Sequence, residues 1–105
     1  MKIVKDGKEY NVKMCISFFS RLKGLMFKKN IDEILCFNKC SSIHTFFMLR
    51  NISVVMTDKN FNILYVFYSI KPWKIILPKK KVYYTFEFKE NLFKYKIGDK
   101  IQIKK

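Results

Sequence analysis

Residues 52–69 read ISVVMTDKNFNILYVFYS and carry the strongest strand signal in the chain. The runs on either side of Asp58-Lys59-Asn60 are rich in β-branched and aromatic residues, which are typical of strands. The polar tripeptide between them has the composition of a tight connection. The stretch therefore predicts a β-hairpin made of Ile52–Thr57 and Phe61–Ser69.

Strand patterns continue on both sides of this hairpin. Apolar and polar residues alternate in Glu9–Ile16 and in Tyr83–Lys89, where Tyr84, Phe86 and Phe88 are expected on one face and Thr85, Glu87 and Lys89 on the other. Ile34–Phe37 predicts a brief strand, and Gly98-Asp99 predicts a tight turn into a last strand with Ile101 and Ile103 pointing inward.

Two short helical segments are also expected. Ser17 can cap a helix in which Phe18, Leu22 and Leu25 recur at helical spacing, with Gly24 near its end as a C-terminal stop. A helical turn is expected near Asn91–Phe93. No repeat or linker divides the 105 residues. We therefore expect one domain over residues 1–105, mainly β, folded as a small antiparallel β-sandwich or barrel with one or two short helices.

Charge is the most conspicuous feature of the composition, with a net charge of +14. A basic surface attracts nucleic acid, so nucleic-acid binding is a reading to test. However, lysine outnumbers arginine 20 to 2 and alanine is absent, a pattern that A- and T-rich codons would also produce. Arginine is the side chain best matched to phosphate, and its scarcity counts against dedicated phosphate recognition.

The compartment can also be inferred from the sequence. The first residues, Met1 to Gly7, lack the apolar stretch of a secretory signal, and no apolar run approaches the ~20 residues of a membrane span. We expect a cytoplasmic protein without a membrane span. Its three cysteines cannot all pair with one another, and the cytosol would keep them reduced.

Four segments resemble a known family. They are Ser20–Phe27, which contains Arg21 followed by Gly24-Leu25-Met26, then Cys40–Met48 with Ile43-His44-Thr45, then Ile52–Asp58, and finally Pro72-Trp73 with Gly98-Asp99. Together they look like the bacterial and archaeal domain of unknown function 192, also labelled uncharacterised protein family 0127, over about residues 10–103. The resemblance implies a compact, mainly β domain and no established reaction.

This chain departs from the family pattern at two places. Ser53 stands where family members often carry an aspartate, and Glu87 is followed by Phe88-Lys89-Glu90-Asn91 where members tend to have a glycine-containing turn. An acid and a permissive backbone position are therefore missing here.

Cys36, Cys40 and His44 are spaced four residues apart, and a helix would align them as soft-metal ligands. The local pattern opposes a helix, and four residues of extended chain span about 13 Å. Buried cysteines beside a hydrogen-bonded histidine are the competing reading, and we expect no metal and no cofactor.

His44 is the only histidine and hence the natural acid-base candidate. Cys40, Ser41, Ser42 and Thr45 are near it in sequence, but no catalytic motif accompanies them. Arg21 could meet an anionic ligand or fasten its own helix to the fold. Trp73 could stack on a ligand, although a lone tryptophan in a small domain usually fills the core, and burial is expected.

The favoured function is a non-enzymatic module that binds a small-molecule or protein ligand through Arg21, His44, Thr45 and Trp73. Two alternatives stay open. One is single-stranded nucleic-acid binding by lysines and exposed tyrosines. The other is a hydrolase or transferase centred on His44.

Overall fold

The computed structural model of the chain describes residues 1–15 and 32–105. Its regular elements are β1 (Lys2–Lys5), β2 (Lys8–Met14), β3 (Ile34–Asn38), β4 (Ile43–His44), β5 (Ile52–Thr57), β6 (Ile63–Ile70), β7 (Ile75–Ile76), β8 (Tyr84–Lys89) and β9 (Gln102–Lys104). All of these elements are strands, so no helix in the described ranges could cross a membrane. The mainly β prediction is confirmed.

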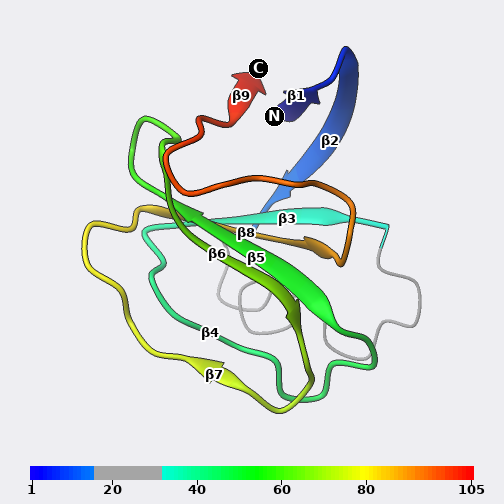
Figure 1. Cartoon of the computed structure of the whole chain (residues 1–105), viewed down its shortest axis with the longest axis vertical. Helices are drawn as coiled ribbons and strands as arrows, with labels where there is room; N and C mark the ends of the chain where they lie inside the picture. The colour runs from blue at the N-terminus through cyan, green and yellow to red at the C-terminus, as the bar shows by residue number, and fades with distance from the viewer. Residues whose placement is uncertain (16–31) are drawn as a thin grey trace.

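Seven strands form one sheet in the order β6-β5-β8-β3-β2-β1-β9, and β4 pairs with β7 separately (Figure 1). The expected hairpin is present as β5 and β6, although β6 begins at Ile63 because Phe61 has a positive φ of 65° and belongs to the connection. The strands predicted in Glu9–Ile16, Ile34–Phe37 and Tyr83–Lys89 correspond to β2, β3 and β8.

The prediction of a purely antiparallel sheet is wrong at one place. β2 and β3 run parallel, with Val12 opposite Ile34 and Met14 opposite Cys36. Parallel neighbours need a crossover of roughly a dozen residues or more, and residues 15–33 supply that length. The large sheet is therefore mixed.

The helical predictions have different outcomes. The helix expected from Ser17, with Arg21 on it, lies outside the described residues. The helical turn expected at Asn91–Phe93 is instead a non-helical turn, in which the Leu92 N–H donates to the Lys89 carbonyl at 3.3 Å. Asn91 has a φ of 66°, and this left-handed backbone prevents an α-helix from continuing through it.

The large sheet curls like half of a barrel. Its two edge strands approach through the chain before β9: Asn62 and Lys100 form an antiparallel bridge, and the Ile63 N–H donates to the Asp99 carbonyl at 2.8 Å. The predicted turn at Gly98-Asp99 is thus also the place where the curl is fastened. The large sheet therefore resembles the expected barrel, but it is not a regular closed barrel.

Apolar side chains cover both faces of the central strands. One core cluster includes Val55, Phe86 and Phe88, together with Ile3, Val12, Ile34, Cys36, Ile63, Phe93, Tyr95 and Ile101. A second cluster, on the opposite face, contains Leu35, Val54 and Met56, together with Cys15, Phe37, Met48, Ile52 and Ile76. Both faces of β5 and β8 are consequently buried.

Candidate functional site

Thr45 fastens two distant loops together. Its buried hydroxyl donates to the Lys71 carbonyl at 2.7 Å and accepts from the Lys74 N–H at 2.8 Å. The Thr45 backbone adds an N–H bond to the Lys74 carbonyl at 2.8 Å and accepts from the Trp73 N–H at 2.9 Å. These hydrogen bonds hold residues 71–74 against the end of β4.

His44, the last residue of β4, is half-buried. Its Nδ1 accepts a hydrogen bond from the Phe46 N–H at 3.2 Å, so the neutral imidazole carries its proton on Nε2. Its ring lies 5.1 Å from the Phe46 ring, measured between centroids. In the described part of the chain no hydrogen bond or ion pair joins His44 to a carboxylate.

Trp73 is 60% exposed, so the expectation that it fills the core is wrong. Its indole lies 5.6 Å from the Phe46 ring and meets the Phe47 ring edge-on at 4.7 Å. The physical reason is that Trp73 sits in the fastened 71–74 turn with a left-handed φ of 65°, outside both core clusters. The turn is stabilised by its backbone bonds and needs no buried indole.

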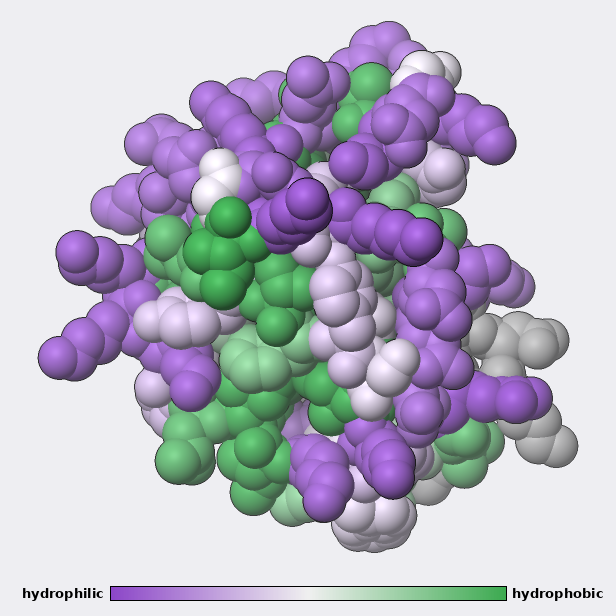
Figure 2. All heavy atoms as spheres, in the orientation of Figure 1, coloured by the Kyte–Doolittle hydropathy of each residue, from purple (hydrophilic) through white to green (hydrophobic). Residues whose placement is uncertain are grey.

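We define the aromatic surface by two sets of residues. His44, Phe46, Phe47 and Trp73 are joined by ring contacts, Ile75 is paired with His44 across β4 and β7, and Leu77 follows two residues after Ile75. The six residues are His44, Phe46, Phe47, Trp73, Ile75 and Leu77. The last four are exposed, Leu77 to 69%. Figure 2 shows hydrophobic side chains gathered over the lower part of this face, where Figure 1 draws β4 and β7. Lys71 and Lys74 flank Trp73 in sequence and are exposed. The surface is apolar with a basic border.

Cys36, Cys40 and His44, the weak candidates for metal ligands, do not form a metal site. Cys36 belongs to the first core cluster, and burial raises the pKa of its thiol to about 12. Cys40 packs on the second cluster, and its Sγ donates to the Ser42 carbonyl at 3.1 Å. Within residues 1–15 and 32–105 no three His, Cys, Asp or Glu side chains are arranged to hold a metal ion.

Of the four residues expected to bind a ligand, the structure brings together His44, Thr45 and Trp73, while Arg21 lies outside the described residues. The family model described as DUF192, Uncharacterized ACR, COG1430, matches residues 1–103. The chain belongs to the DUF192 family. The match extends further toward the N-terminus than the residues that first indicated it.

Two relatives of this DUF192 domain are named as UPF0127 proteins. The UPF0127 protein PH1112 of Pyrococcus horikoshii is 38% identical over 113 aligned positions, covering 95% of this chain and 96% of the relative. The UPF0127 protein TK1120 of Thermococcus kodakarensis is 35% identical over 82 positions, covering 72% of this chain and 52% of the relative.

Two crystal structures share the fold. One is a protein of unknown function from Novosphingobium aromaticivorans, with a TM-score of 0.79 and 12% identity over 97% of this chain and 82% of that one. The other, from Sinorhizobium meliloti, is described as a putative transcription regulator. It has a TM-score of 0.79 and 14% identity, and the match covers 96% of this chain and 89% of that one.

The DUF192 domain also contains a buried acid that the sequence analysis missed. Glu87 was expected on the polar face of its strand, but it is only 4% exposed and its Oε1 has no hydrogen-bond partner in the described residues. Burial raises the pKa of Glu87 to about 8. The alternating pattern could not predict the burial of Glu87. A period of two assigns residues to the two faces of a strand but does not show whether both faces are covered.

Proposed function

We propose that this DUF192 domain is a non-enzymatic binding module whose aromatic surface docks an acidic protein segment that carries apolar side chains. The observation that supports this most is Trp73, a 60% exposed indole held between Phe46 and Phe47. Exposed aromatic residues in a preset geometry are typical of binding hot spots, because they bury a large area at little entropic cost.

The stiffness of the aromatic surface supports a binding role. The hydrogen bonds of Thr45 hold the turn that carries Trp73, and they are made inside the domain before any partner arrives. A partner therefore pays less to order the surface, which favours affinity.

The charge of the chain indicates the chemistry of the partner. With a net charge of +14 and Lys71 and Lys74 beside the indole, an acidic partner is attracted and a basic one repelled. The partner should also carry apolar side chains, because the exposed Ile75 and Leu77 stabilise a complex only when apolar groups cover them and remove them from water.

Single-stranded nucleic acid is the second candidate, because an exposed indole beside lysines can also stack on a base. The Sinorhizobium protein described as a putative transcription regulator is a further motive for testing it. A hydrolase or transferase centred on His44 has less support, since a backbone N–H already occupies the imidazole nitrogen that would accept a proton.

The test uses Trp73, the only tryptophan of the chain, as a fluorescent probe. A synthetic peptide of alternating glutamate and leucine is titrated into the protein, and a thymidine oligonucleotide is titrated in parallel. We expect the peptide to shift the Trp73 emission to the blue as the indole leaves water. Leu77→Ser should weaken peptide binding by about tenfold, the value of one buried leucine at an interface.

The matched control is Ile97→Ser, which removes an apolar side chain of the same 69% exposure between Tyr95 and Gly98, away from the aromatic surface. It should bind the peptide as the unchanged protein does. Binding of the oligonucleotide alone, with a steep salt dependence, would replace the protein partner by nucleic acid. A Trp73 emission that responds to neither probe would refute the proposal.

A further inference from the structure

A polar cleft opens where β1 and β9 part. The two strands pair as far as Val4 opposite Gln102, after which β1 runs into the Asp6-Gly7 turn and the chain before β9 folds back across the sheet. The space between them has a volume of 320 Å³ and is lined by Lys5, Asp6, Tyr95, Asp99, Lys100 and Gln102. It lies at the opposite end of the molecule from β4 and β7 (Figure 1).

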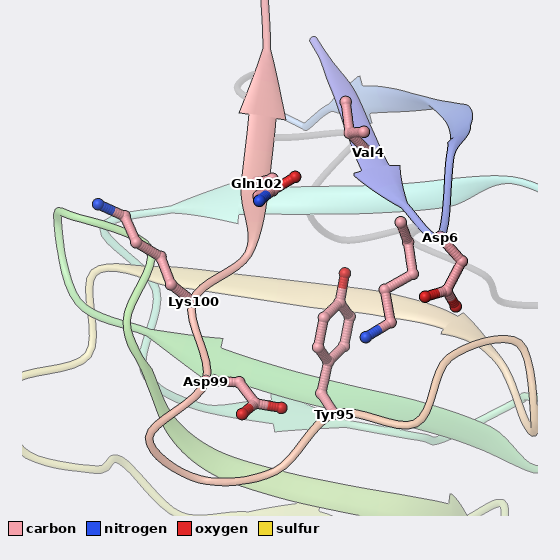
Figure 3. A pocket seen from close by; sticks show the side chains of 7 residues that line it. Val4, Asp6, Tyr95, Asp99, Lys100 and Gln102 are labelled. Atoms are coloured by element: carbon pink, nitrogen blue, oxygen red, sulfur yellow. The ribbon is translucent and has the colours of Figure 1, made fainter.

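Tyr95 supplies the most informative group of this cleft. The residue is 4% exposed, and its hydroxyl has no hydrogen-bond partner in the part of the chain that the structure describes. Figure 3 shows the phenol oxygen pointing toward the gap between β1 and β9, with Asp99 near the base of the ring and Gln102 beyond it. A buried hydroxyl without a hydrogen-bond partner destabilises the fold. A ligand that supplied this hydrogen bond would remove that cost.

The Tyr95 ring is held in place from several sides. The centroids of the Tyr95 and Phe93 rings are 5.4 Å apart, and the Tyr68 hydroxyl donates to the Tyr95 backbone carbonyl. The Lys5 ammonium lies 4.7 Å from the centroid of the Tyr95 ring. The flexible lysine side chain is the contact that can move most easily. A ligand that displaced the Lys5 side chain would meet the phenol oxygen.

The lining of the cleft carries both signs of charge. Asp6 and Asp99 are its acidic side chains and Lys5 is its basic one, whereas Figure 3 shows the Lys100 side chain directed away from the phenol oxygen. One oxygen of Asp99, Oδ2, accepts from the Lys96 N–H at 2.9 Å and fixes the turn, which leaves the other oxygen for a ligand. Such a lining suits a molecule that carries both signs of charge.

We propose that this cleft binds a small zwitterion of the free α-amino acid class. The ligand carboxylate lies toward Lys5, its ammonium lies toward Asp6 and Asp99, and the Tyr95 hydroxyl gains its missing hydrogen bond. At 320 Å³ the cleft is at the small end of the range of ligand pockets, which suits a molecule of this size. This site is independent of the aromatic surface.

The experiment follows the backbone amide signals of the full chain by NMR while each of the twenty L-amino acids is added. For those that bind, the N-acetyl and the carboxamide derivatives are tested, because each removes one charge. We expect at least one amino acid to shift the signals of Asp6, Tyr95 and Gln102. Both of its derivatives should bind about tenfold more weakly, since each loses a charge-assisted hydrogen bond.

Two variants separate binding from folding. Tyr95→Phe removes only the unpartnered hydroxyl. It should leave the thermal stability of the domain unchanged while weakening the binding of the amino acid by about tenfold. Asp6→Asn removes the charge of Asp6 but keeps a residue type that tolerates its φ of 53°. This variant should weaken the binding of the amino acid by a similar factor. Tyr65→Phe, on β6, is the control and should change neither property. No shift with any amino acid, or undiminished binding of both derivatives, overturns the proposal.

Discussion

Glu87 lies in the middle of β8, between Leu35 of β3 and Val54 of β5. An ionised carboxylate there would face the second core cluster without a hydrogen-bond partner for Oε1 in the described residues. Burial therefore raises its pKa from 4.5 to about 8, so the folded protein holds a proton that the unfolded chain releases.

This difference makes stability depend on pH. Because the folded pKa is raised, the contribution of Glu87 is fully present below about pH 4.5 and is lost as the pH rises toward 8. The free energy of unfolding should fall by roughly 3 kcal/mol between pH 5 and 8, given ~1.4 kcal/mol for each pKa unit. Urea titrations of Glu87→Gln over this range should lack the fall, whereas Glu90→Gln should retain it. An identical pH profile in both variants would show that Glu87 titrates normally.

Thr45 is the second residue whose role can be measured directly. Thr45→Val keeps the shape of the side chain but removes the donor to Lys71 and the acceptor for Lys74. We expect a loss of about 1–3 kcal/mol in urea unfolding, with a changed Trp73 emission in the folded state because the turn loosens. Thr57→Val is the control: its hydroxyl donates to the adjacent Asp58 carbonyl, so the Trp73 emission should not change. Equal emission changes would refute the special role of Thr45.

At the scale of elements, the β5–β6 hairpin depends on its connection. The Asp58 carboxylate accepts from the backbone N–H groups of Asn60 and Asn62 at 2.9 and 3.0 Å and from the Asn62 side chain at 3.1 Å. Partial burial raises the pKa of Asp58, but the hydrogen bonds from Asn62 and Asn60 outweigh it and lower the pKa overall. The ionised side chain therefore stabilises the hairpin.

Asp58→Ala should destabilise the domain by about 1–2 kcal/mol in urea at pH 7, because two backbone N–H groups lose their acceptor. Since the folded pKa is lowered, this difference should shrink as the pH falls below the ordinary value of 3.8. Lys59→Ala, in the same connection, should have little effect. A stability loss that stays constant down to pH 2 would contradict a contribution from the charged form.

The elements also show how far sequence reasoning reaches. Hairpin and strand positions follow from local alternation and turn residues, so β2, β3, β5 and β8 could be predicted. The parallel pairing of Val12 with Ile34 could not, because strand direction depends on the path of the crossover between them. Similarly, His44 and Thr45 could be selected from the sequence as candidates, whereas the exposure of Trp73 depends on a turn that a distant loop holds in place.

At the scale of the whole molecule, the curled sheet separates two surfaces of different chemistry. The bridge between Asn62 and Lys100 draws the two edges together and leaves the charged cleft near β1 and β9. The aromatic surface lies on β4 and β7 at the other end (Figure 1). The sequence offered no signal for the cleft, since Lys5, Tyr95 and Gln102 meet only when the termini pair.

The aromatic surface, as we propose it, is a docking site, and its occupancy can be measured. The most direct measurement is an NMR titration of the full chain with the alternating glutamate and leucine peptide. We predict saturable shifts at the amides of His44–Leu49 and Lys71–Leu77, with the signals of β1 and β9 unmoved. Shifts spread over lysines throughout the surface, or no shifts at all, would contradict the claim.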